Sequence, residues 1–167
     1  AQCSLLQSYI QKARRVVFFG GAGVSTESGI PDFRSADGLY HQKYTVPPEV
    51  ILSHTYFLAH PAEFYRFYRD KMNCLAAAPN PAHHTLAKWE KMGKVSAVVT
   101  QNIDGLHTKA GSRTVWELHG SIHRNYCMDC GKPYPAEAIF DSSEPVPHCA
   151  CGGVIRPDVV LYEEGLS

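Results

Sequence analysis

The stretch at residues 16–28, VVFFGGAGVSTES, decides which fold to expect. It opens with a short run of β-branched and aromatic residues, which is typical of a buried strand. Glycines follow at once, and Ser25, Thr26 and Ser28 then supply side chains that favour the start of a helix. A strand, a glycine turn and a capped helix in this order present backbone N–H groups to a phosphate. The stretch therefore predicts a dinucleotide-binding turn.

This turn departs in two ways from the usual dinucleotide fingerprint. Thr26 stands where the third glycine of a Gly-x-Gly-x-x-Gly motif would fall. No acidic residue is obviously placed to hold a ribose in the manner of dehydrogenases. A tight strand-to-helix turn that binds no ligand therefore remains open from these residues alone.

Segments before and after the turn extend the pattern. Apolar residues at helical spacing, Leu5, Leu6, Tyr9 and Ile10, predict an amphipathic helix over about the first dozen residues. Asn80-Pro81 is a good cap and first-turn proline for a second helix. Further predictions are a mostly helical stretch at 48–72 whose aromatic side chains are packing residues, an end of the second helix at about Met92, and strands at 95–100 and 114–118. Strands that alternate with helices favour a parallel α/β sheet.

The composition argues against two classes of partner, nucleic acids and membranes. The 167 residues include 16 basic and 16 acidic side chains, so no net charge draws the chain to nucleic acid or to an anionic membrane. No apolar run approaches the ~20 residues that span a bilayer. The first 13 residues, AQCSLLQSYIQKA, carry their charge after the apolar residues, unlike a signal peptide. We therefore expect a cytoplasmic protein with no direct nucleic-acid partner and no membrane partner.

Four of the six cysteines form two close pairs. Cys127 and Cys130 are separated by two residues, and after 18 intervening residues Cys149 and Cys151 are separated by one. In a reducing compartment such pairs are typical of a four-thiolate zinc ribbon. Because four thiolates fill a tetrahedral shell, the predicted Zn²⁺ is structural, with one ion per chain.

Two alternatives for the cysteines remain open at this point. The cysteines could form disulfides, or a histidine, His123 or His148, could replace one ligand. The surrounding residues 122–157 are rich in proline and glycine, which favours an insert held by metal and not by an apolar core.

Polar residues also follow two of the predicted strands. Residues 100–104 read TQNID, and residues 117–120 read ELHG. Ligands of a doubly wound sheet bind beyond the carboxyl ends of its strands, so both clusters are expected to face the crevice at the Gly23 loop. A histidine there can accept a proton near neutral pH. His119 is therefore the candidate base among nine histidines.

Together these residues resemble the sirtuin family. Residues 21–34, GAGVSTESGIPDFR, are similar to its NAD-binding signature, and residues 101–107, QNIDGLH, to its second motif. Residues 118–120, LHG, resemble its catalytic-histidine motif, and the cysteine pairs fall where the family carries its small zinc module. The resemblance covers nearly the whole chain, from Arg15 to Leu166.

The resemblance implies an α/β fold, with a Rossmann-like parallel sheet and an inserted small zinc-ribbon module. The expected parts are an NAD-binding domain at 1–121 with a helical insert at about 36–73, the zinc-ribbon module at 122–157, and a return to the Rossmann-like domain at 158–167. The family's fold continues with further strands and NAD-binding loops, so the sheet is expected to be incomplete here.

The resemblance also implies a reaction, the NAD-dependent removal of acetyl groups from protein lysines. The acyl oxygen attacks the sugar as nicotinamide leaves, and His119 activates a ribose hydroxyl, which yields free lysine and O-acetyl-ADP-ribose. His119 and Asn102 are the implied catalytic residues. The implied cofactor-binding residues are Gly21, Ala22, Gly23, Thr26, Asp32, Phe33, Arg34, Gln101, Asn102, Ile103, Asp104 and His119.

The resemblance further implies how an acetyl-lysine peptide binds. Val159, Val160, Leu161 and Tyr162 resemble the strand that pairs with the extended substrate, a mode in which backbone hydrogen bonds supply affinity. An ordinary strand of the sheet is the alternative for these residues.

The acyl preference follows from a second comparison with the family. Sirtuins that prefer succinyl or malonyl lysine carry a Tyr-x-x-Arg pair. Here Tyr65 aligns with the tyrosine and Tyr68 with the arginine, which favours acetyl or another neutral acyl group. A shift of one residue would bring Arg69 into the arginine position.

Other functions stay open from the sequence. One is a catalytically inactive module that binds NAD or ADP-ribose and keeps a structural zinc; the missing C-terminal part of the fold supports it. Another is a nicotinamide-dependent dehydrogenase, against which the motifs at Gln101 and His119 argue. A mono-ADP-ribosyltransferase would lie within the family. The sequence does not name the physiological substrate or the oligomeric state.

Overall fold

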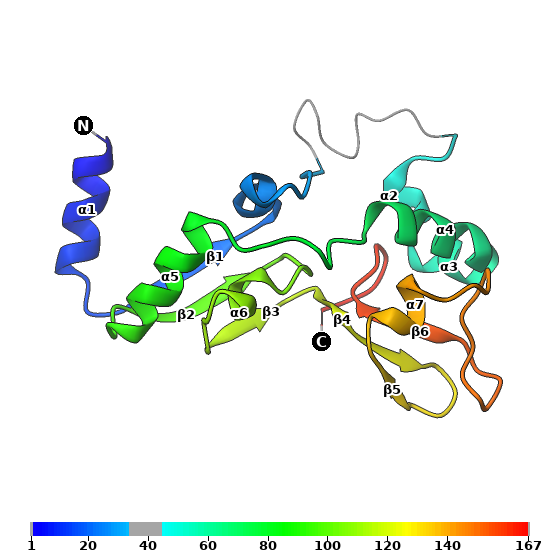
Figure 1. The fold of residues 1–167 in the computed structure, drawn as a ribbon. Coiled ribbons are helices and arrows are strands. Elements are labelled where there is room, and N and C mark those ends of the chain that lie inside the picture. The colour runs from blue at the N-terminus through cyan, green and yellow to red at the C-terminus, as the bar shows by residue number, and fades with distance from the viewer. Residues whose placement is uncertain (1, 34–44, 167) are drawn as a thin grey trace.

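A computed structural model describes residues 2–33 and 45–166 of the chain. Its elements form two groups that lie side by side and are joined by a strand between them (Figure 1). One group holds a parallel sheet, and the other holds a cluster of short helices and a small antiparallel sheet. None of the helices in the two described ranges is long and apolar enough to cross a bilayer.

Three strands form the parallel sheet, in the order β1 (Val16–Gly20), β2 (Val95–Thr100) and β3 (Val115–Glu117). All three were predicted from the sequence. The central strand β2 buries Val95 and Val98 against Leu86 of helix α5 (Pro81–Lys91). The side chain of Asn80 accepts a hydrogen bond from the backbone N–H of Ala82, so α5 begins at the predicted cap.

The other face of the parallel sheet is open within the described residues. Side chains alternate along a strand, so Val17, Phe19 and Trp116 point away from α5 and are 58%, 62% and 62% exposed. Helix α1 (Gln2–Lys12), the predicted first helix, buries none of its residues and stands apart from this face (Figure 1). Parallel sheets are normally covered on both faces. The described part of the chain therefore covers only one face of its Rossmann-like sheet.

Helices α2 (Pro48–Ile51), α3 (His54–Ala59) and α4 (Pro61–Lys71) form the helical cluster. Its core consists of aromatic rings, since Phe57, Phe64, Tyr65 and Tyr68 are all at most 2% exposed. Phe64 lies edge-on to Phe57, with 4.9 Å between ring centroids, and stacks on Tyr68 at 5.6 Å. Both arrangements are favourable for aromatic pairs. The aromatic residues are thus packing residues, as the sequence predicted.

The small sheet is antiparallel and connects the two groups. Strand β4 (Gly120–Cys127) lies between β5 (Pro133–Tyr134) and β6 (Ile155–Val159), with the short helix α7 (Glu137–Phe140) close to β6 and α4. β4 begins beyond the end of β3 and runs to the first cysteine of the metal cluster. At its start Gly120 has φ +79°, and an added Cβ would lie 1.9 Å from the carbonyl oxygen of Asp158. Only glycine allows β4 and β6 to approach this closely.

Two elements differ from the sequence prediction. The helix after the glycine turn is a 3₁₀ helix, η1 (Ala22–Ser28). It begins at Ala22 and not at Ser25, and it is followed by the C-cap residue Gly29, whose φ is +81°. The strand expected at 159–161 instead starts at Ile155 and ends at Val159, because its hydrogen bonds follow β4 and its last pairing is with Gly120.

Candidate active site and metal centre

A buried polar network lies beyond the carboxyl ends of β1 and β2. The hydroxyl of Ser25, in η1, donates to Oδ2 of Asp104 at 2.6 Å and accepts from Nδ2 of Asn102 at 3.1 Å. Oδ1 of Asp104 accepts from the backbone N–H of Leu106 at 2.9 Å. All three polar side chains are at most 8% exposed. The glycine turn and the residues after β2 are therefore joined into one site, as expected for strand ends of a parallel sheet.

Helix α5 adds a histidine to this network. Nδ1 of His83 accepts from the backbone N–H of Asn80 at 3.1 Å, so the ring proton of the neutral histidine must lie on Nε2. Nε2 is 3.5 Å from the hydroxyl oxygen of Ser25 and can donate to it. Burial lowers the pKa of His83 and favours this neutral form. Ser25 is thus held from three sides, by His83, Asn102 and Asp104.

The ring of a second buried histidine packs against the ring of His83. His107, in helix α6 (Leu106–Lys109), is 2% exposed and lies edge-on to the ring of His83, with 4.7 Å between centroids. Burial, and secondarily the neighbouring His83, lowers the pKa of His107 to about 4. His107 is therefore a neutral packing group at physiological pH.

Gln101 lies directly over the glycine turn. Its backbone N–H donates to the carbonyl of Gly20 at 2.9 Å. Its side-chain Oε1 would be 3.0 Å from a Cβ added to Gly21, so a larger residue at position 21 would press against the carboxamide. The side chain of Gln101 is exposed, so its amide is available to a ligand.

The geometry of His119 is that of a candidate base. Its Nδ1 is 2.9 Å from the backbone carbonyl oxygen of Gln101. Because a carbonyl only accepts, Nδ1 carries the proton of the neutral ring and Nε2 keeps its lone pair. The side chain is partly exposed, and the backbone carbonyl of His119 accepts from the N–H of Val160 at 3.0 Å. His119 thus lies between the residues after β2 and the segment after β6, with one ring nitrogen able to take a proton.

The remaining predicted cofactor residues are distributed around this site. Ala22 and Gly23 lie in η1, and the hydroxyl of Thr26 donates to the carbonyl of Gly23 at 3.0 Å. Ile103 is partly buried against the aromatic core, as is Phe33, which follows Asp32 after η1. Arg34 lies outside the described residues.

Tyr65 and Tyr68, the two residues on which the acyl prediction depends, lie in the aromatic core. The ring of Tyr65 is fully buried there, and its hydroxyl donates to the carbonyl of Ile155 at 2.6 Å. Burial raises the pKa of Tyr65. Tyr68 is equally buried, and Nε of Arg69 donates to the carbonyl of Ile139 at 2.8 Å.

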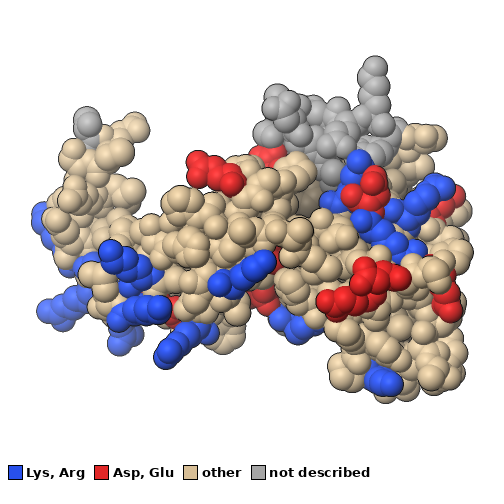
Figure 2. All heavy atoms as spheres, in the orientation of Figure 1, with Lys and Arg blue, Asp and Glu red and all other residues tan. Residues whose placement is uncertain are grey.

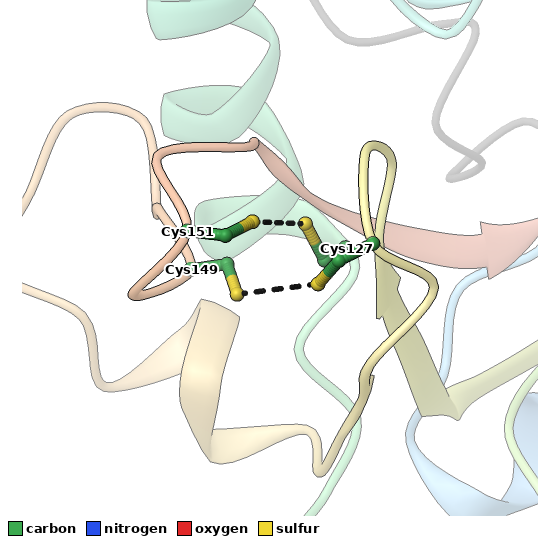
Figure 3. A group of neighbouring side chains, drawn as sticks. Cys127, Cys149 and Cys151 are labelled. Atoms are coloured by element: carbon green, nitrogen blue, oxygen red, sulfur yellow. Dashed lines mark hydrogen bonds between the residues drawn. The ribbon is translucent and has the colours of Figure 1, made fainter.

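The four predicted metal ligands lie together at the end of the small sheet. The sulfur atoms of Cys127, Cys130, Cys149 and Cys151 all lie within 4.8 Å of one another. The sulfur of Cys127 lies 3.5 Å from that of Cys151, and the sulfur of Cys130 lies 3.7 Å from that of Cys149; Figure 3 labels Cys127, Cys149 and Cys151 in this cluster. A tetrahedral zinc with Zn–S bonds of about 2.3 Å requires sulfur–sulfur distances of about 3.8 Å. The cluster therefore fits a four-thiolate zinc site, and these separations are too long for disulfides.

The backbone around the cysteines is built for close turns. A Cβ added to Gly153 would lie 2.6 Å from the sulfur of Cys127 and 2.8 Å from the carboxylate of Asp129. The two alternative ligands are placed elsewhere in the described structure. His123 contacts the carbonyl of Asp104 at 3.2 Å and His148 contacts Glu144 at 3.3 Å, and neither belongs to the cluster.

Sequence reasoning missed Ser25 and His83 as site residues. Ser25 was interpreted as a helix cap, and His83 was not singled out among the histidines. Ser25 and His83 are 58 residues apart in the chain, and only the packing of α5 against the parallel sheet brings them together. No local pattern signals such a pairing.

Comparisons with known proteins agree with this geometry. The profile of the Sir2 family matches residues 21–167. A protein named NAD-dependent protein deacetylase from Clostridium acetobutylicum is 59% identical over 165 residues, which cover 97% of this chain and 67% of that protein. A relative with the same name from Sulfurisphaera tokodaii is 47% identical, over 98% of this chain and 65% of its own length.

Solved structures give the same result. A Sir2 structure with deacetylated p53 peptide and 3′-O-acetyl-ADP-ribose has a TM-score of 0.91 and 42% identity, and the match covers 98% of this chain and 67% of that one. A Sir2 structure with p53 peptide and NAD⁺ has a TM-score of 0.87 and 41% identity, with 100% and 67% covered. The chain thus spans about two thirds of the length of the proteins it matches.

Proposed function

Because the chain belongs to the Sir2 family, we propose that it is the catalytic part of an NAD-dependent protein lysine deacetylase. The observation that carries this proposal is the placement of His119. Its Nδ1 is held by the carbonyl of Gln101, its Nε2 has no hydrogen-bond partner among residues 2–33 and 45–166, and its backbone contacts Val160, in the segment expected to bind the peptide. One residue therefore touches both the predicted cofactor motif and the predicted substrate segment.

The glycine turn and the residues after β2 would hold NAD. We assign NAD-binding roles to Gly21, Ala22, Gly23, Thr26, Asp32, Phe33, Arg34, Gln101, Asn102, Ile103, Asp104 and His119. The hydrogen-bonding groups of these residues suit NAD. The backbone N–H groups of the glycine turn favour phosphates, and the exposed carboxamide of Gln101 can form hydrogen bonds with an amide. Bound NAD would supply a sugar carbon that is open to attack by the acyl oxygen as nicotinamide leaves.

His119 would act as the general base of the reaction. Its Nε2 would take the proton of a ribose hydroxyl, while the bond from Nδ1 to the carbonyl of Gln101 keeps the ring in the required tautomer. Asn102, fixed by Ser25, would present a preorganised polar group beside it. A positioned base contributes about 10²–10⁴-fold to rate.

The peptide would add to the edge of the small sheet. β6 is an edge strand, since β4 occupies only one of its sides in the order β5-β4-β6. We propose that Val159, Val160, Leu161 and Tyr162 bind an extended acetyl-lysine peptide there. We also propose that the broken Tyr-x-x-Arg pair at Tyr65 and Tyr68 favours an acetyl or another neutral acyl group.

Two further proposals concern the architecture. We propose that the four cysteines hold a structural Zn²⁺, and that the chain divides into parts at 1–121, 122–157 and 158–167. A cytoplasmic location is also proposed, because a four-thiolate zinc site needs reduced cysteines.

The first test is mass spectrometry of the chain incubated with NAD and an acetyl-lysine peptide, beside its His119→Ala variant. We expect loss of the acetyl group and formation of O-acetyl-ADP-ribose with the unmodified chain, and a rate at least about 10²-fold lower for the variant. His84→Ala is the matched control, because His84 is an exposed histidine of α5 outside the site. Equal turnover by the His119 variant would contradict the assignment, and NAD binding without product would favour an inactive binding module.

A further inference from the structure

Directly after β6, residues 160–164 form a turn that is bonded to the start of α3; this segment is called the hook below. The backbone N–H of Tyr162 donates to the carbonyl of Leu52, and the N–H of His54 donates back to the carbonyl of Tyr162, both at 3.0 Å. The N–H of Glu164 then closes a turn onto the carbonyl of Leu161 at 3.1 Å. The segment proposed to pair with peptide is therefore fastened to the start of α3, and not only to its own sheet.

The carboxylate of Glu164 is the centre of this hook. Nη2 of Arg156 lies 2.6 Å from both of its oxygens. Nδ1 of His54 donates to one oxygen at 2.7 Å, and the backbone N–H of Leu161 donates to the other at 2.9 Å. Three donors from β6, α3 and the hook itself thus converge on one carboxylate.

The Arg156–Glu164 ion pair is largely buried, and its surroundings favour the ionised form of Glu164. The side chains of Arg156 and Glu164 are 11% and 18% exposed, so both charges are largely removed from water. Hydrogen bonds from Arg156, Leu161 and His54 lower the pKa of Glu164 despite the desolvation that raises it. A carboxylate can accept from all three donors, whereas a carboxamide has only one acceptor oxygen. The ionised form of Glu164 is the form that the surroundings require.

Glu163 forms a second set of hydrogen bonds between the hook and α3. Glu163 has φ +75° and is the one residue other than glycine with positive φ in the described ranges. Its Oε2 accepts from the backbone N–H and the hydroxyl of Thr55, at 2.9 and 2.6 Å. Positive φ is unfavourable for glutamate, so the backbone turn at 163 persists because surrounding contacts hold it.

The hook lies against the residues of the proposed reaction. The N–H of Val160 donates to the carbonyl of His119, and the next N–H in the chain, that of Leu161, donates to Glu164. Among hydrogen bonds between described residues, the carbonyl of Val160 accepts none and remains available to a strand added at this edge. The direction of that carbonyl depends on the two N–H bonds beside it.

We propose that Glu164 is a positioning residue for the peptide substrate, which sets the backbone of 159–161 in the extended form that a lysine peptide pairs with. Glu164 touches neither NAD nor the reacting atoms in this role; it acts through Leu161 and Arg156. The inference rests on the proposed deacetylase function. Its consequence is that loss of the carboxylate weakens peptide recognition and leaves NAD recognition unchanged.

The test is a steady-state comparison of the chain with its Glu164→Gln variant. We expect the KM for an acetyl-lysine peptide to rise about tenfold or more, in keeping with loss of a charge-assisted hydrogen bond, while the KM for NAD and the kcat at saturating peptide change by less than about twofold. Glu144→Gln is the matched control, because it removes the carboxylate of an exposed His148–Glu144 pair on the zinc module. An unchanged peptide KM in Glu164→Gln, or an equal fall in kcat with both substrates, would overturn the proposal.

A milder variant covers the case in which Glu164→Gln fails to fold. His54→Ala removes one donor, whose side chain is 40% exposed, and leaves the Arg156–Glu164 pair intact. It is expected to raise the peptide KM in the same direction by a smaller factor. No change in that KM would count against the positioning role.

Binding of a fluorescent acetyl-lysine peptide, followed by anisotropy, separates this inference from the proposed function. If the unmodified chain forms no product but binds the peptide, and Glu164→Gln does not, the deacetylase proposal fails and the positioning role stands. Equal binding by the chain and its variant, or no binding by either, overturns the positioning role.

Discussion

Gln101 shows how much of the site depends on backbone atoms. Its N–H is bonded to Gly20, its carbonyl orients His119, and its carboxamide lies over Gly21. The resemblance of residues 101–107 to a family motif predicted a role for Gln101, and the structure adds its two backbone contacts, with Gly20 and with His119. A substitution at position 101 would therefore remove a ligand group and leave His119 oriented.

Gly120 gives the sharpest prediction at the scale of a residue. Gly120→Ala would place a methyl group 1.9 Å from the carbonyl oxygen of Asp158, in addition to requiring alanine at φ +79°. We expect the free energy of unfolding to fall by about 3 kcal/mol or more in urea titrations. Gly93→Ala is the control, because Gly93 has φ +72° and no atom near an added Cβ, so it should lose only about 1 kcal/mol. Equal losses would show that the close approach of β4 to β6 adds no cost.

Among the elements, the small sheet is held both by apolar residues, such as Ile122 and Ile155 in the aromatic core, and by the four-cysteine cluster at its end. β5 has two residues and α7 has four, and neither would be stable alone. The cysteines lie at the end of β4 and in the turn before β6, so one ion would join both sides of the module.

Metal removal is the corresponding prediction. Treatment with a zinc chelator, or Cys149→Ser, is expected to raise amide hydrogen exchange throughout residues 127–155 and to leave β1 and β2 protected. Hydrogen-exchange mass spectrometry measures both regions in one experiment. Cys3→Ser is the control, since Cys3 is an exposed thiol of α1 outside the cluster. Equal deprotection of both sheets would contradict a local structural role for the metal.

For the whole molecule, charge and burial are distributed unevenly. Figure 2 shows lysine and arginine side chains gathered around the end of the molecule that holds α1 and α5, while most of the acidic side chains visible in this view lie on the other group of elements. The total nevertheless cancels, so the net charge of zero did not reveal this asymmetry. Of the buried titratable groups, His83, Asp104 and His107 lie at the site, whereas Tyr65 and Tyr68 lie in the aromatic core.

The stability of the whole fold is predicted to depend on pH through His107. Its pKa of about 4 in the folded chain lies below the ordinary value of about 6.5, so between these values the unfolded chain binds more protons. The stabilisation from neutral His107 is therefore complete above about pH 6.5 and is lost as pH falls towards 4, by about 3 kcal/mol in all. Urea unfolding at pH 7 and pH 5 measures the effect.

His107→Phe keeps a ring against His83 and removes the proton, so we expect a smaller difference in stability between the two pH values. His84→Phe, on the exposed side of α5, should leave the difference unchanged. The same pH dependence in the His107 variant as in the parent chain would show that other groups, His83 among them, cause it.

The sequence by itself determined the local elements and the family. Strands β1 and β2, the cap at Asn80, the aromatic packing and the four-cysteine cluster all depend on periodicity or short spacings, which neighbouring residues set. The boundaries of η1 and β6 were not predictable in this way, because a glycine turn and pairing with β4 decide them.

Only the tertiary structure decided which polar groups meet. Ser25 joins His83 and Asp104 across 58 and 79 residues, and Glu164 joins His54 across 110. The alignment at Tyr65 did not indicate its packing, and the structure shows that its ring lies in the core. Such contacts arise from the burial of apolar faces against one another, and a polar side chain then bonds to whichever group that packing brings within reach.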